Sequence, residues 1–103
     1  MKGKITRIAA LNDHFRQTSN HFLLTNGVSN LPNIPGLIGE IRRYKDFNED
    51  NDPYEEHDFG NLSWQGRSIF WKIDYYDQQL SQWHDPAKDS CKRILTVLLA
   101  DEY

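Results

Sequence analysis

The densest group of ionisable side chains in the sequence is the run Glu55-Glu56-His57-Asp58. An imidazole beside carboxylates can act as a general base or bind a metal ion, because it titrates near neutral pH. With Asp74 further along the chain, Glu56, His57 and Asp58 could therefore form the centre of a small acid–base or metal-dependent enzyme. The same cluster also fits a structural role, in which a carboxylate holds the imidazole at the start of a strand.

This run belongs to a strongly acidic segment, residues 46–58, which we call the acidic loop. Seven of its thirteen residues are acidic and none is Lys or Arg. A block of like charge usually stays in solvent, and an acidic surface attracts basic partners. The candidate binding residues are Asp46, Glu49, Asp50, Asp52, Glu55 and Glu56.

The oxygen-bearing side chains from Asp46 to Asp52 also resemble the first half of an EF-hand calcium loop. However, His57 stands at the twelfth position, where an EF-hand has a bidentate glutamate, and Pro53 interrupts the segment. A strand rather than a second helix is expected to follow. We therefore predict no specific metal site and no cofactor.

The elements that must hold this loop follow from hydrophobic periodicity. Apolar residues at helical spacing predict a first helix over residues 5–17, with Asn12, Asp13 and Arg16 facing solvent. A short strand is expected at residues 21–25, because the run is apolar and is followed by Asn-Gly, a pair that favours turns.

A second helix is predicted to begin near Pro35, because a first helical turn does not need the missing N–H. Its apolar face consists of Leu37, Ile38, Ile41 and Tyr44. If the two helices lie side by side, they would form a basic patch from Arg7, Arg16, Arg42, Arg43 and Lys45.

After the acidic loop the apolar pattern changes to period two, which is typical of strands. Residues 59–64 and 68–76 are predicted to form a hairpin around the turn 65–67. On the second strand, Lys72 and Asp74 share one face and could pair, whereas the core face carries Ile69, Trp71, Ile73 and Tyr75. Residues 93–99 predict a central strand, with a helix as the alternative.

This order of elements predicts one α+β domain over residues 1–103, with an antiparallel sheet of about four strands and two helices packed on one face. A single cysteine excludes a disulfide framework, and Cys91 is expected to be a buried small hydrophobe. The sequence has no apolar run that could cross a bilayer, so we expect a cytoplasmic protein without membrane contact.

The formal net charge of −3 conceals an uneven distribution. Residues 1–45 carry seven basic and two acidic residues, whereas residues 46–103 carry five basic and thirteen acidic residues. This balance makes direct binding of nucleic acid an unfavourable hypothesis. It favours another protein as the partner, for example one with a basic nucleic-acid-binding surface.

Several motifs resemble a small bacterial family known as domain of unknown function 3768. The similarity rests on the runs NDPY, EHDFG, FWKIDYYD and LADEY, and also on residues 7–13 and 24–28. Its signature residues here are Asp52, Pro53, Tyr54, His57, Asp58, Phe59, Gly60, Trp71, Lys72, Asp74 and Tyr75. The resemblance implies a single-domain bacterial protein from plasmids, phages or integrated elements, and it implies no activity.

Three hypotheses about function follow from these observations. The first is a non-catalytic binding protein, such as an anti-CRISPR or anti-restriction inhibitor, that acts through its acidic surface. The second is the enzyme centred on the Glu-His-Asp cluster. The third is a structural or regulatory accessory protein whose signature residues serve the fold. The first is favoured, because the chain is small and no recognised catalytic motif is present.

Overall fold

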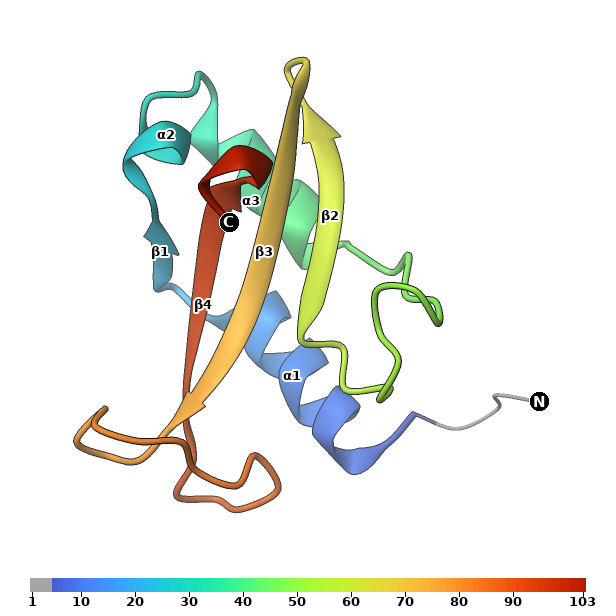
Figure 1. The fold of residues 1–103 in the computed structure, drawn as a ribbon, viewed down its shortest axis with the longest axis vertical. Helices are drawn as coiled ribbons and strands as arrows, with labels where there is room; N and C mark the ends of the chain where they lie inside the picture. The colour runs from blue at the N-terminus through green and yellow to red at the C-terminus, as the bar shows by residue number, and fades with distance from the viewer. Residues whose placement is uncertain (1–4) are drawn as a thin grey trace.

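A computed structural model describes residues 5–103. Helices α1 and α3 lie behind a four-stranded sheet, and a short helix, α2, lies beside one end of it (Figure 1). The elements in chain order are α1 (Arg7–Thr18), β1 (Phe22–Leu24), α2 (Asn26–Ser29), α3 (Ile34–Arg42), β2 (Phe59–Trp64), β3 (Arg67–Tyr76), β4 (Lys92–Leu99) and a terminal 3-10 helix, η1 (Ala100–Glu102). The predicted α+β class, with two helices on one face, is confirmed.

The sheet is mixed, with strand order β1-β4-β3-β2. Strands β2, β3 and β4 are antiparallel neighbours, whereas β1 runs parallel to β4, with Phe22 opposite Leu95. The expectation of a wholly antiparallel sheet is therefore wrong for β1. The reason is the long connection through α2, α3, β2 and β3, which lets β4 run in the same direction as β1.

The core lies between the sheet and the helices. Alternate residues of β3 point into it as predicted, and Trp71 is fully buried at its centre. The other buried apolar side chains of the core cluster are Val28, Leu37, Ile41, Tyr44, Ile69, Ile73, Tyr75, Leu95, Val97 and Leu99. Cys91 is only half-buried and packs against this cluster from the side.

Local residue chemistry explains most element ends. Thr6 caps α1 by accepting a hydrogen bond from the Ala9 N–H, and Asn33 caps α3 through the Gly36 N–H. The first strand ends before Asn26-Gly27, as predicted, but these two residues begin α2, which Thr25 caps, and neither has a positive φ. No helix within residues 5–103 is long and apolar enough to cross a membrane.

Glycines are required at two places in the predicted hairpin. Gln65 and Gly66 connect β2 to β3, and both have positive φ, 52° and 77°, as a type I′ turn requires. Gly60 faces the Trp71 ring across the strand pair, and a Cβ at this position would collide with that ring and with Tyr44. The sheet can therefore close over Trp71 only because residue 60 has no side chain.

Candidate functional site

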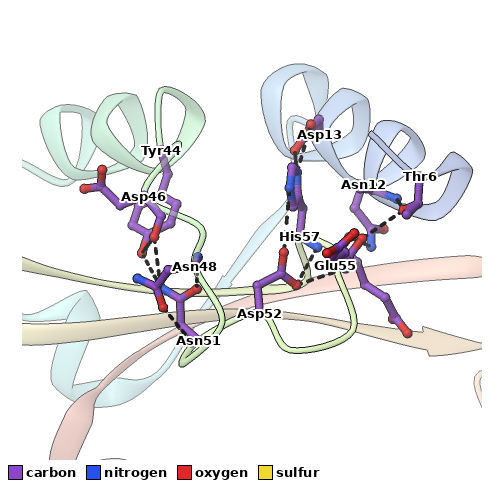
Figure 2. Close-up of polar contacts among 12 residues, drawn as sticks. Thr6, Asn12, Asp13, Tyr44, Asp46, Asn48, Asn51, Asp52, Glu55 and His57 are labelled. Carbon is purple, nitrogen blue, oxygen red and sulfur yellow. Dashed lines mark hydrogen bonds and ion pairs between the residues drawn. The ribbon is translucent and has the colours of Figure 1, made fainter. Parts of the chain in front are cut away.

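The acidic loop connects α3 to β2 and folds back against the core (Figure 1). Two asparagines fix its first half. The Asn48 side-chain oxygen accepts hydrogen bonds from the Asp50 and Asn51 N–H groups, at 2.8 and 3.1 Å. The Asn51 amide donates to the Asp46 carbonyl at 2.9 Å and to the Tyr44 hydroxyl at 3.3 Å (Figure 2). The Asn48 side-chain oxygen, one of the ligands that the calcium alternative requires, is thus already used within the loop.

Asp52 fixes the second half of the loop from the inside. Asp52 is only 5% exposed, and one of its carboxylate oxygens accepts hydrogen bonds from the Glu56 and His57 N–H groups, at 2.9 and 3.0 Å. Glu55 and His57 both have positive φ, at 56° and 55°, so the chain turns sharply around this carboxylate. Asp52 therefore does not contribute to the acidic surface, contrary to its place among the predicted binding residues.

His57 attaches the loop to α1 (Figure 2). Its Nδ1 lies 2.9 and 3.1 Å from the two carboxylate oxygens of Asp13, and its Nε2 lies 3.7 Å from Asp52 Oδ2. The ring also stacks on Phe47, with centroids 3.8 Å apart and planes within 3°. We call Asp13, His57, Asp52 and Phe47 the histidine clamp.

Arg16 on α1 connects Asp13 of the histidine clamp to the end of α3. The side chain is 2% exposed, and it donates to the Ile41 and Tyr44 carbonyls and to Asp13, at 3.0, 3.1 and 3.0 Å. The Ile41 carbonyl belongs to the last turn of α3, where it also accepts the Tyr44 N–H at 3.1 Å, and the Tyr44 carbonyl lies two residues beyond the helix. The prediction that Arg16 faces solvent, or belongs to a surface basic patch, is wrong because its guanidinium satisfies these groups.

A hydrogen-bond network separate from the histidine clamp joins α1 to the sheet. The Asn12 amide donates to the Tyr75 hydroxyl at 2.8 Å and to the Glu56 carbonyl at 2.9 Å. Tyr75 in turn donates to the Glu56 carboxylate at 2.7 Å. Burial, and then this hydrogen bond to Glu56, raise the pKa of Tyr75. Arg93 of β4 also belongs to this network, because it donates a hydrogen bond to the Asn12 side-chain oxygen.

The other ionisable residues of the enzyme hypothesis are Asp58 and Asp74, and they lie close enough for the charge of Asp74 to act on Asp58. Burial, followed by the nearby charge of Glu56, raises the pKa of Asp58 from 3.8 to about 6. Asp74 pairs with Lys72, as predicted, on the face of β3 that points away from the helices. Glu56 and His57 are held by Tyr75 and Asp13 on the helix side.

The family model described as "Protein of unknown function (DUF3768)" matches residues 24–102. The chain belongs to this family. Neither the curated proteins nor the solved structures contain a significant match to it. The similarity at residues 7–13 lies outside the matched segment.

In this DUF3768 protein, the five predicted binding residues other than the buried Asp52 divide into two groups. Asp46, Glu49 and Asp50 are exposed on the outside of the loop. Glu55 and Glu56 are half-buried near α1, where the Thr6 hydroxyl donates to the Glu55 carbonyl at 2.8 Å. Within residues 5–103, the structure shows no group of three or more His, Cys, Asp or Glu side chains that could hold a metal ion.

The residues that hold this DUF3768 loop were not identified as site residues from the sequence. These are Asn12, Asp13 and Arg16 of α1, together with Phe47. One signal was available, since residues 12 and 13 lie four and three positions before residue 16 and so share one helix face. That face was assigned to solvent because its residues are polar.

Proposed function

We propose that this protein is a non-catalytic binding protein that presents its acidic loop, held rigid, to a basic partner protein. One observation carries the proposal. The inner groups of the loop are hydrogen-bonded to the fold, whereas Asp46 and Asp50 are exposed and form no ion pair with any residue of the described part of the chain.

The rigidity of the loop supports this function for a physical reason. A surface that is already ordered loses little conformational entropy when it binds, so more of the contact energy remains as affinity. Grouped carboxylates also steer a basic partner towards the encounter. Such a partner would have a basic nucleic-acid-binding channel, as a CRISPR or restriction effector has, and the loop would inhibit it by occupying that channel.

The acid–base alternative has less support from the geometry. General acid–base catalysis needs its groups within hydrogen-bond reach of one reacting centre. Here His57 is fixed between Asp13 and Asp52, and Asp74 lies on the other face of the sheet. The contacts of His57 instead support a fold-holding role for the signature residues, which is the accessory hypothesis. That role is compatible with binding, since a held loop is what a binding surface needs.

The test is a comparison of two double variants of the full chain. Asp46→Asn with Asp50→Asn removes two loop charges, and Asp89→Asn with Asp101→Asn removes the same charge elsewhere on the surface. A protein captured by the wild type is purified, and its affinity for all three chains is measured against salt. Two exposed ion pairs of about 0.3–1 kcal/mol each predict a loss of about three- to thirty-fold for the loop variant alone. Equal affinity of the two variants, or binding indifferent to salt, contradicts the proposal.

A further inference from the structure

A groove lies on the side of the fold away from the acidic loop. Figure 1 shows β1 and the acidic loop at opposite edges of the sheet. The groove has a volume of about 960 Å³ and is bordered by the second half of α1, the segment leading into β1, and the start of β4. This volume is near the upper end of the range for small-molecule sites. Its apolar lining consists of Leu11, Phe15, Phe22, Leu23 and Ile94.

The charge around this groove has one sign. Its lining includes Lys92, Arg93, His14 and His21 but no Asp or Glu, although the chain has 15 acidic residues. Within residues 5–103, the structure shows no ion pair to Lys92 or Arg93. Exposed Lys92 is therefore an available partner for an anion at the mouth of the groove.

Arg42 adds positive potential from behind the groove wall. Its guanidinium lies 5.5 Å from the Phe22 ring centroid and donates to the Ser19 carbonyl at 2.8 Å, and both residues line the groove. It forms no ion pair in the described part of the chain, and its buried Nε has no hydrogen-bond partner. An anion bound nearby would offset this uncompensated charge.

We infer that the groove binds a small amphipathic carboxylate, with an apolar body against Phe15 and Phe22 and its head group near Lys92. A neutral apolar ligand would leave the positive charge uncompensated. A peptide that extended the sheet would have only three residues of β1 to pair with, which is a short template. A small ligand with one anionic end matches both the apolar lining and the charged mouth.

Cys91 supplies a direct readout, because it lines the groove and is the single cysteine of the chain. The probe is monomeric decanoate, compared with decylamine, which has the same chain and a positive head group. Decanoate is expected to bind in calorimetry and to slow the labelling of Cys91 by a maleimide, whereas decylamine should bind about ten-fold more weakly or not at all.

Matched variants assign the binding to the groove. Lys92→Glu reverses the charge at its mouth, and Lys88→Glu makes the same change at an exposed residue of the β3–β4 loop outside the lining. We expect about ten-fold weaker decanoate binding for Lys92→Glu and unchanged binding for Lys88→Glu, with melting curves confirming that both fold. The inference is refuted if decanoate does not protect Cys91, if both variants bind it equally, or if phosphatidylcholine vesicles or a polyglutamate peptide protect Cys91 better than decanoate. Neither variant alters the acidic loop, so failure here leaves the proposed function untouched.

Discussion

The histidine clamp should contribute a measurable part of the stability of the fold, and His57→Ala tests this directly. The substitution removes the 2.9 Å hydrogen bond to Asp13 and the stacking on Phe47. A hydrogen bond to a charged group contributes about 1.5–3 kcal/mol, and an aromatic pair about 0.5–1.5 kcal/mol. Because the imidazole is 18% exposed, water recovers part of this loss. We expect the free energy of unfolding to fall by about 2–3 kcal/mol.

The assay is urea unfolding followed by far-UV circular dichroism, together with a thermal melt. For a domain of this size, the expected change corresponds to a melting temperature lower by roughly 10–20 °C. The matched control is His14→Ala. His14 is exposed and follows Asp13 on α1, so its substitution should change stability by less than about 0.5 kcal/mol in either direction.

A double-mutant cycle separates the clamp from a general loss of packing. Asp13→Ala, His57→Ala and the double variant should give a coupling energy of about 1–2 kcal/mol, because the two side chains are in direct contact. The reasoning fails if His57→Ala unfolds within about 0.5 kcal/mol of the wild type, or if the two changes are additive. In either case the loop would be held by something other than this contact.

Two further predictions concern groups next to the clamp. The pKa of Asp58 is raised in the folded state from 3.8 to about 6, so the folded chain binds more protons than the unfolded chain between these values and stability falls as pH rises through them. Asp58→Asn should therefore be more stable than the wild type at pH about 7.5 and nearly equal at pH about 3.5 in urea unfolding, whereas a constant difference across pH contradicts the assignment. Arg16→Lys should lower stability by about 2 kcal/mol or more, because one ammonium cannot replace a guanidinium that reaches two carbonyls and a carboxylate. The exposed Arg43→Lys is its control, and equal unfolding midpoints for the two variants would contradict this role of Arg16.

The hairpin could be predicted from the sequence because its determinants are local. Alternation along β3 assigns Ile69, Trp71 and Ile73 to one face, and a strand pair with that face buried leaves little freedom in register. The short turn at Gln65-Gly66 then fixes the pairing of β2 with β3. These features need no information from distant parts of the chain.

The clamp could not be predicted in the same way, because its two halves lie 44 residues apart. Periodicity assigns a polar side chain to solvent unless a buried partner is known, and the partners of Arg16 are backbone carbonyls at the end of α3. Backbone groups have no sequence signature of their own. The composition of the acidic loop likewise does not distinguish Asp50 from Asp52. Asp50 is exposed, whereas Asp52 is buried and accepts hydrogen bonds from two backbone N–H groups.

The matched family segment begins at residue 24, whereas Asp13 and Arg16, which hold the loop, lie upstream in α1. His57, one of the signature residues, thus has Asp13, the nearer of its two carboxylate partners, outside the matched segment. Without α1, the Ile41 and Tyr44 carbonyls would lose the Arg16 guanidinium, and the buried Trp71 ring would lose the cation 5.3 Å from its centroid. We therefore expect the folding unit of this chain to include α1 as well as the matched segment. The contacts that hold the acidic loop, on which the proposed function depends, thus include residues of α1 outside that segment.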